Sequence, residues 1–244
     1  MGDWAKAYHL QVKQKKKMKK LVIMMIAMMV SFASFAQNKD VTKFLGIPVD
    51  GTVASVKQKL KAKGFKQSPF FDSQLEGRFN GYDSYVSIIE NNGKVWRISV
   101  VDKIFTDETN IRIRFNNLCQ QFLKNKKYVP TQKLEEMLIS DDTDISYEMT
   151  VGKKRFQAVF FQEPSDSSAV KKVVMDALLE KYTSEQIAAP TEEISNDVSA
   201  ISINALGDLL SKKTVWFMIN ENYGSYCITI HYENEYNKAD GEDL

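Results

Sequence analysis

The chain has 244 residues, a formal net charge of +2, two cysteines and two histidines. Residues 1–36 hold seven of the 33 basic and one of the 31 acidic side chains, so the remainder carries a net charge of about −4. This mildly acidic remainder excludes a global electrostatic attraction to nucleic acid or anionic lipid. The scarcity of cysteine and histidine excludes a tetrahedral zinc site within one chain. The chain shows none of the common cofactor motifs, and we expect no cofactor.

Residues 18–36 predict export. A basic pair precedes ten consecutive apolar residues, 21–30, and Ser34 and Ala36 fit the small-residue positions before a signal-peptidase cut. A membrane anchor needs about 20 apolar residues, so we expect cleavage and no remaining transmembrane anchor. Cleavage would leave residues 37–244 in the periplasm or outside the cell. The polar, basic stretch before Met18 is interpreted as an upstream extension, residues 1–17, or as a long start of the signal peptide.

The first half of the mature chain predicts helices followed by strands. A helix over 52–63 has Asp50 or Thr52 as its cap and Gly64 at its end. An Asn-Gly pair predicts a hairpin turn, and apolar alternation predicts a three-stranded antiparallel meander. The expected strands are Gln74–Phe79, Tyr82–Glu90 and Lys94–Val101. A second helix is predicted after Asp107.

The second half predicts a more mixed succession of elements. Residues 129–144 are interpreted as a loop and residues 183–198 as an exposed linker or long loop. Alternation and helical spacing of the apolar residues predict the other elements. These are a hairpin of Ile145–Val151 and Arg155–Gln162, a helix over 166–182, a short helix over 201–210, and closing strands Val215–Asn220 and Ser225–Glu233.

The pattern of a helix followed by strands begins near residues 52, 108 and 166. It predicts an α+β fold in which a mainly antiparallel sheet of about seven strands has helices packed on one face. We expect residues 37–244 to form one domain, with a division near 130 or 190 as the alternative. The sheet face away from the helices would then be partly polar and exposed.

Several segments resemble known proteins. The stretches "GIPVDGTVASVKQKLKAKGF", "NNGKVWRISVV" and "VWFMI" resemble a family of exported proteins of gut Bacteroidetes-type bacteria without assigned activity. The resemblance implies a bacterial envelope or secreted location and implies no functional residues. At the level of fold, "DGTVASVKQKLKAKGF" and the strands after it are similar to units of β-lactamase-inhibitor-protein-like and outer-membrane assembly-lipoprotein folds.

Candidate binding residues come from the exposed sheet face and from the aromatic C-terminal region. Trp216 is a candidate anchor because exposed tryptophan is favoured in binding surfaces, although a strand buried on both faces would also explain it. Cys227 and His231 lie about 13 Å apart on one strand face, too far to form a nucleophile–base pair. The candidates of the exposed sheet face are Arg78, Arg97, Glu148, Gln157 and His231.

Two further features have a functional and a plain interpretation. Asp141, Asp142 and Asp144 offer carboxylates that suit Ca²⁺, yet they lack the glycine and glutamate of an EF-hand loop, so a solvated loop is the preferred interpretation. Cys119 falls on a buried helix stripe and Cys227 on a polar strand face, which disfavours a disulfide between them.

These observations favour an exported, non-enzymatic binding or envelope-assembly module, with a protein or cell-surface ligand held on its exposed sheet face. One alternative is a periplasmic hydrolase that uses carboxylates, because the chain holds many acidic side chains. Another is an inhibitor or sensor that inserts a loop, such as residues 129–144, into a second exported protein. Nothing in the pattern favours nucleic acid as a partner.

Overall fold

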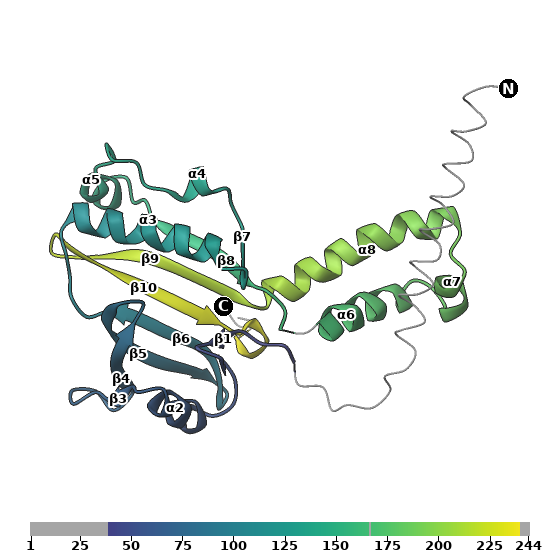
Figure 1. Cartoon of the computed structure of the whole chain (residues 1–244), viewed down its shortest axis with the longest axis horizontal. Helices are drawn as coiled ribbons and strands as arrows, with labels where there is room; N and C mark the ends of the chain where they lie inside the picture. Colours follow the sequence, from purple (N-terminus) through teal and green to yellow (C-terminus); the bar gives the residue numbers. More distant parts are fainter. Residues whose placement is uncertain (1–38, 166, 240–244) are drawn as a thin grey trace. The chain divides into compact units, whose positions relative to one another are not determined.

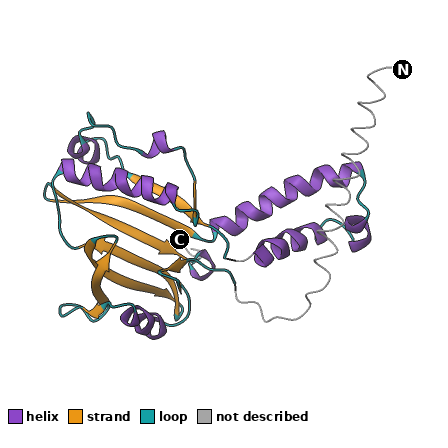
Figure 2. Cartoon of the chain, viewed as in Figure 1, coloured by secondary structure: helices purple, strands orange, loops and turns teal. Residues whose placement is uncertain are grey.

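The computed structural model describes residues 39–165 and 167–239 as an α+β structure. Its elements follow the chain from purple to yellow in Figure 1 and are separated into helices and strands in Figure 2. Contacts divide the chain into a sheet unit, residues 40–164 together with the chain from Leu209 onward, and a helical unit that includes residues 165–208. The predicted upstream extension and signal peptide lie outside the described residues.

An antiparallel sheet of eight strands forms the sheet unit, which confirms the predicted class with one strand more than expected. The strand order is β3-β4-β5-β6-β10-β9-β8-β7. The predicted hairpin turn at Asn80-Gly81 has positive φ values of 50° and 85°, as a type I′ turn requires. The strands are β3 Lys66–Gln67, β4 Gln74–Phe79, β5 Tyr82–Asn91, β6 Lys94–Asp102, β7 Tyr128–Pro130, β8 Gln157–Gln162, β9 Thr214–Asn222 and β10 Ser225–Glu233.

The sheet unit repeats one arrangement twice. Helix α2, Val53–Ala62, precedes strands β3 to β6, and helix α3, Glu108–Lys124, precedes strands β7 to β10. The last strands of the two halves, β6 and β10, pair with each other in the middle of the sheet. The helix expected near residue 166 begins an insertion between β8 and β9, so it does not start a third helix-and-strand unit of the sheet.

Helix α2 begins and ends as the sequence predicts. The Thr52 side chain accepts a hydrogen bond from Ser55 N at the start of the helix. At the end, Phe65 N donates to Leu60 O and Gly64 takes a positive φ of 99°, which is the Schellman arrangement. This turn directs the Phe65 ring onto β4, where Gly77 lacks the side chain that would collide with it.

Helix α3 contributes much of the core. The Asp107 side chain caps it by accepting from Asn110 N at 2.8 Å. Phe115 of the helix meets Phe217 of β9 with ring centroids 5.2 Å apart. The same side of the helix buries Ile111, Leu118, Cys119 and Phe122, so the predicted apolar stripe is confirmed.

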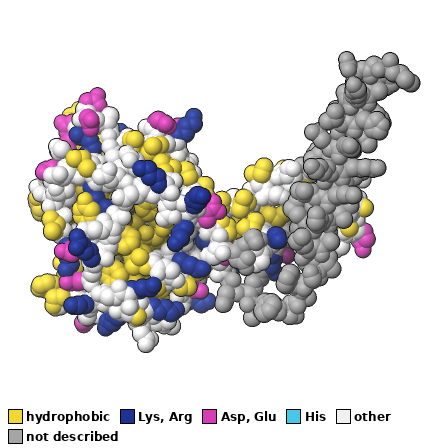
Figure 3. Space-filling model, viewed as in Figure 1, with side chains coloured by type: hydrophobic (Ala, Val, Ile, Leu, Met, Phe, Trp, Pro, Cys, Tyr) yellow, Lys and Arg dark blue, Asp and Glu magenta, His cyan; other side chains and the backbone are white. Residues whose placement is uncertain are grey.

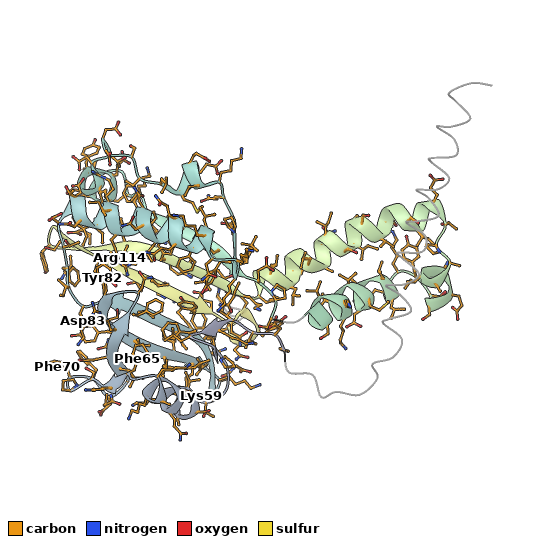
Figure 4. All side chains as sticks on the ribbon, in the orientation of Figure 1. Lys59, Phe65, Phe70, Tyr82, Asp83 and Arg114 are labelled. Carbon is orange, nitrogen blue, oxygen red and sulfur yellow. The ribbon has the colours of Figure 1, made fainter. Side chains whose placement is uncertain are left out.

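One buried arginine fixes α3 to the sheet. The Arg114 guanidinium forms an ion pair with Asp102 of β6 at 3.2 Å. It also bonds to Asn80 Oδ1 and stacks on the Tyr82 ring, with its central carbon 3.7 Å from the ring centroid. Figure 4 labels Arg114 and Tyr82, which lie close together between α3 and β5. The contact joins the second half of the sheet unit to the first.

Residues 40–49, here called the N-terminal strap, contain the two-stranded sheet of β1, Lys43–Phe44, and β2, Ile47–Pro48. Phe44, in the middle of the strap, is completely buried. The Phe44 ring contacts rings from three other segments of the chain, namely Phe65, Phe79 and Tyr232. The strap is therefore part of the core of the sheet unit.

Polar contacts also hold the N-terminal strap to the end of the chain. Thr42 Oγ1 donates to the Glu233 carbonyl, and Asn234 Nδ2 donates to the Val49 carbonyl at 2.8 Å. Lys213, which is completely buried, places its Nζ 2.8 Å from the Asp40 carboxylate. The first ten residues of the sheet unit are thus joined to the end of β10, to the residue after it and to the residue before β9.

The segment between β7 and β8 differs from the sequence prediction. The predicted strand Ile145–Val151 is helix α5, Ile145–Thr150, because the Asp144 side chain accepts from Tyr147 N and caps a helical turn. The short helix α4, Leu134–Met137, lies in the predicted loop over 129–144. Asn116 of α3 pairs with both backbone groups of Ile139, so this segment lies against α3.

The helical unit contains α6, Ser167–Leu179, α7, Ser184–Ala188, and most of α8, Glu192–Ser211. The prediction of an exposed linker over 183–198 is wrong, because a capping box of Thr183 and Gln186 begins α7. Asp197 of α8 accepts hydrogen bonds from Lys181 and Tyr182, which follow α6. Among the helices of the described ranges, none combines the length and apolar character needed to cross a membrane.

Candidate functional site

The candidate site lies on the sheet face that points away from α2 and α3, here called the free face. Alternation along the central strands separates the two faces. On the helix side the strands bury Ile98, Val100, Phe217, Ile219, Ile228 and Ile230. Their neighbours along each strand point to the free face and are more polar, as the sequence predicts for a sheet with helices on one side.

Cross-strand pairing arranges the free face in rows across five strands, β5, β6, β10, β9 and β8. One row consists of Tyr85, Val101, Thr229, Met218 and Gln157. The next row consists of Ser87, Ser99, His231, Trp216 and Val159. A third row begins with Ile89, Arg97 and Glu233. Trp216 and His231 are therefore direct neighbours near the middle of the face.

Five side chains of these rows form a connected group, here called the tryptophan–arginine cluster: Ser99, Arg97, Trp216, His231 and Glu233. Trp216 Nε1 donates to Glu233 Oε1 at 2.8 Å, and Arg97 Nη2 lies 2.5 Å from the same oxygen. The Trp216 and His231 rings have centroids 4.2 Å apart. The Arg97 guanidinium also lies over Trp96, 4.1 Å from the ring centroid.

His231 is neutral at physiological pH in this environment. Burial, followed by the nearby Arg97 charge, lowers the pKa of His231 to about 4, and Glu233 opposes the shift. His231 Nδ1 lies 2.8 Å from Ser99 Oγ. Ser99 is only 6% exposed, so its hydroxyl is not accessible as a nucleophile must be. The Ser99–His231 contact therefore fixes the imidazole ring.

The carboxyl group of Glu235 meets that of the cluster member Glu233. Glu235 follows β10, and burial together with a hydrogen bond to Glu233 raises the pKa of Glu235, while Lys238 opposes the shift. The hydrolase alternative predicts perturbed carboxyl groups of this kind. Glu233, however, is buried and already bonded to Arg97 and Trp216, so it is not open to a substrate.

The structure brings together most of the predicted binding residues. Arg97, Trp216 and His231 are in the tryptophan–arginine cluster, and Gln157 lies on the neighbouring strand row. Arg78 lies near the margin, on β4, where it pairs with Asp83 in register and bonds to the Gly81 carbonyl. Trp216 is partly exposed, whereas its strand neighbours Val215 and Phe217 are buried.

One predicted site residue was misplaced and two cluster members were missed. Glu148 lies on α5 and is not on the sheet, because the segment predicted as a strand is helical. Glu233 shares the strand parity of His231, two residues away, and this signal could have identified it. Ser99 has no local signal of a role, and only its register opposite His231 reveals its contact.

Two of the three acidic residues considered for Ca²⁺ have local structural roles. Asp142 accepts a hydrogen bond from Ser140, and Asp144 caps α5. Across residues 39–165 and 167–239, no three His, Cys, Asp or Glu side chains are grouped so that they could hold a metal ion. Asp144 therefore stabilises the start of α5, and Asp142 stabilises the turn before it.

Both cysteines are buried free thiols. Burial raises the pKa of Cys119 to about 12 and that of Cys227 to about 11. Cys227 is on the free face, as predicted from its parity, but it is only 2% exposed. Neither thiol is accessible or easily ionised, so neither has the properties of a nucleophile.

A scan against protein-family models, a search of curated proteins and a search of solved structures gave no match to this chain. A functional proposal for this chain therefore rests on the side chains of the free face. The fold and the cluster together define an α+β sheet protein with an ordered aromatic centre on the face away from its helices.

Proposed function

We propose that the chain is an exported, non-enzymatic binding module whose free face docks on an apolar patch of a protein partner. The export part rests on the signal-like segment 18–36. The observation that carries the binding part is the tryptophan–arginine cluster, whose partly exposed aromatic centre is held in one arrangement by contacts within the chain. Preorganised aromatic and arginine side chains near the middle of a surface are typical of binding hot spots.

The hydrogen bonds of the cluster indicate the kind of ligand. Trp216 Nε1 and His231 Nδ1 each have a partner inside the cluster, and Glu233 accepts from both Trp216 and Arg97. Few directional groups remain for a small polar ligand such as a sugar, which is recognised through hydrogen bonds. What the cluster offers is ring surface, and ring surface favours apolar side chains of a partner protein.

The surroundings of the cluster have the composition of an interface. Partly exposed Tyr85, Val101, Met218 and Val159 adjoin it in the strand rows. Exposed Gln157 and Arg78 lie farther out. An apolar centre with a polar rim is the usual anatomy of a protein–protein interface.

The free face is also large enough for a specific contact. In the order of the sheet, β4 and β8 are separated by β5, β6, β10 and β9, and at about 4.8 Å between neighbouring strands they lie about 24 Å apart. Along β10, the distance from Cys227 to Glu233 is about 20 Å. The projected area is about 500 Å², and the relief of the side chains adds to it. Specific interfaces bury about 800 Å² per partner, with weaker complexes below that value.

A photo-crosslinking experiment in the native envelope fraction tests the proposal. The crosslinking amino acid benzoylphenylalanine replaces Gln157 on the free face in one variant and Gln120 on α3 in another, both exposed glutamines. We expect one protein adduct from position 157 and none from position 120. Trp216→Ala and Val159→Glu, each combined with the probe at 157, should abolish that adduct.

The two substitutions separate loss of binding from loss of folding. Val159 is partly exposed, so Val159→Glu adds a charge to the apolar centre without opening a core cavity. Urea unfolding of each variant checks that the fold is retained. An adduct that survives both substitutions, or that forms equally from position 120, contradicts docking through the free face.

A further inference from the structure

A second surface lies on helix α2 and on the loop between β3 and β4, residues 68–73. Lys57 Nζ of the helix donates to the Asp72 carbonyl of the loop at 2.8 Å, so the two segments adjoin each other. Helix α2 packs Val56 and Leu60 into the core from the side of the sheet opposite the free face. The helix and the loop together, here called the lysine–phenylalanine surface, are therefore separate from the free face.

The lysine–phenylalanine surface is positively charged. Residues 51–71 hold five lysines and no aspartate or glutamate. Among the residues that the structure describes, no carboxylate forms an ion pair with any of these lysines, so their charge is available to a ligand. The five are Lys57, Lys59, Lys61, Lys63 and Lys66.

The carboxylates beside this surface do not cancel its charge. Asp50 and Asp72 flank the lysine-rich segment along the chain, and Glu76 pairs in register with Lys66. The Glu76 carboxylate is itself bonded to a further lysine, Lys103, at 2.5 Å. Six lysines therefore face three carboxylates, which leaves a net charge of about +3 on this surface. The chain after residue 36 has the opposite net sign, so the positive charge is a local excess.

The lysines of α2 are placed for contact with a flat surface. Pairs of lysines one turn apart flank the helix on its two sides, Lys57 with Lys61 and Lys59 with Lys63. Between the two flanks, the ridge that points away from the sheet has only small or uncharged side chains, which are the exposed Ala54, Gln58 and Ala62. The helix can therefore lie along a surface while the long lysine side chains reach it on both sides.

Two phenylalanines protrude from the loop beside the helix. Phe70 is 74% exposed and Phe71 is 62% exposed. The loop that presents them is ordered, because the Gln67 side-chain amide donates to the Phe71 and Asp72 carbonyls and Phe70 N donates to Ser68 Oγ. In Figure 3 hydrophobic side chains protrude at the lower left of the sheet unit, where Figure 4 labels Phe70. Covering both rings would remove a large apolar area from water.

The composition of this surface favours anionic lipid as its ligand. Protein–protein interfaces are enriched in arginine and depleted in lysine, whereas residues 51–71 have five lysines and no arginine. Lysines next to a bilayer are attracted to the layer of anionic headgroups without a fixed geometry. Phenylalanine side chains enter the boundary between headgroups and acyl chains. A bilayer therefore accommodates both kinds of side chain at once.

We propose that the lysine–phenylalanine surface docks the protein on a lipid bilayer that contains anionic lipid. The lysines on both flanks of α2 contact the headgroups, and Phe70 and Phe71 enter the boundary beneath them. Because α2 and the free face lie on opposite sides of the sheet, docking in this way turns the free face away from the bilayer. The free face then stays available to a protein partner.

Vesicle flotation of residues 37–244 tests this second proposal. These residues contain every helix and strand described above and omit the apolar run 21–30, which would itself enter lipid. The vesicles contain phosphatidylcholine either alone or mixed with phosphatidylglycerol. We expect flotation with the mixed vesicles and much weaker flotation with phosphatidylcholine alone. Raising the NaCl concentration to about 0.5 M should reduce flotation, because salt screens exposed charges.

Substitutions at exposed positions test the two parts of the surface separately. Lys59→Gln combined with Lys61→Gln should weaken partitioning into the mixed vesicles roughly 20-fold. Phe70→Ser and Phe71→Ser should each weaken it about tenfold. Urea unfolding checks that each variant keeps its fold.

The matched controls lie beyond the middle of the sheet. Lys153→Gln with Lys154→Gln removes the same charge from exposed positions before β8, which four strands separate from β4. Tyr147→Ser on α5 truncates an aromatic side chain that is 58% exposed, close to the value for Phe71. Both controls should partition like the unsubstituted chain.

Three results overturn the proposal. The first is absence of flotation with the mixed vesicles. The second is equal weakening by the control substitutions, which would assign the binding to net charge or to any exposed aromatic ring. The third is binding of soluble polyglutamate or oligothymidine that the mixed vesicles do not displace, since it assigns the lysines to an acidic protein or to nucleic acid. None of these results bears on crosslinking from the free face, so the two proposals succeed or fail separately.

Discussion

The His231 ring lies against the Trp216 ring with centroids 4.2 Å apart, while His231 Nδ1 lies 2.8 Å from Ser99 Oγ. The two contacts hold a neutral imidazole between an indole and a buried hydroxyl. Protonation of His231 would place a second positive charge near the Arg97 guanidinium, so the folded protein disfavours the protonated imidazole. This relationship makes the stability of the protein depend on pH.

We expect the free energy of unfolding to fall as the pH drops from about 6.5 to about 4. The unfolded chain binds a proton at His231 near the ordinary pKa of 6.5, whereas the folded chain binds it only near the lowered pKa of about 4. The loss between these values is on the order of 2 kcal/mol. Urea unfolding across this range measures it for the unsubstituted chain and for His231→Gln, in which the carboxyl groups titrate as before. Parallel pH profiles for the two proteins would contradict the prediction.

Removing the partner of the buried Lys213 should destabilise the sheet unit. Asp40→Asn leaves the ammonium group with neutral acceptors in a place where it is completely buried. We expect a loss of about 3 kcal/mol in the free energy of unfolding. Lys213→Met combined with Asp40→Asn should recover part of that loss, because no uncompensated charge remains. Additive effects in this double-mutant cycle would show that the ion pair is not coupled.

The native thiols should react slowly with Ellman's reagent. Burial raises the pKa of Cys119 to about 12 and that of Cys227 to about 11, so little thiolate is present at pH 8. In urea both should react at the rate of an ordinary thiol. Gln157→Cys supplies an exposed thiol as the control and should react within the mixing time. Rapid reaction of one equivalent in the folded, unsubstituted chain would sink this expectation.

Gly77→Ala should destabilise the first half of the sheet unit. A Cβ at this position would lie 2.4 Å from Cδ1 of Phe65, which is less than any real carbon–carbon contact. Displacing the ring should lower the free energy of unfolding by about 1–3 kcal/mol, and Phe65→Leu should recover part of it. The control is Gly207→Ala in α8, where a Cβ meets nothing within 4 Å. That change should leave stability equal or about 0.5–1 kcal/mol higher.

Local signals in the sequence were sufficient for some elements. Helix α2 could be predicted with its cap and its Schellman end because Thr52, Gly64 and Phe65 act within a few residues of the helix. Strand parity likewise placed Arg97 and His231 on the free face. Such signals depend on the neighbouring residues alone, and the tertiary structure did not override them.

Other elements depend on information that a local pattern does not contain. Ile145, Tyr147 and Met149 alternate as in a strand, but the cap from Asp144 makes the segment helical, and this error also misplaced Glu148. The pairing of β6 with β10 joins segments more than 120 residues apart, for example Val101 with Thr229. The tryptophan–arginine cluster assembles only across that pairing, so its contacts could not be read from the sequence.

The N-terminal strap has a consequence for the order in which the protein can fold. Phe44 and Thr42 are among the first residues of the sheet unit, yet their partners include Tyr232 and Glu233 of the last strand. Because a chain is synthesised from its N-terminus, this core cannot close until β10 has been made. In a product truncated before β10, Phe44 and Thr42 would lack these partners. The N-terminal strap would then stay unpacked and accessible to proteases.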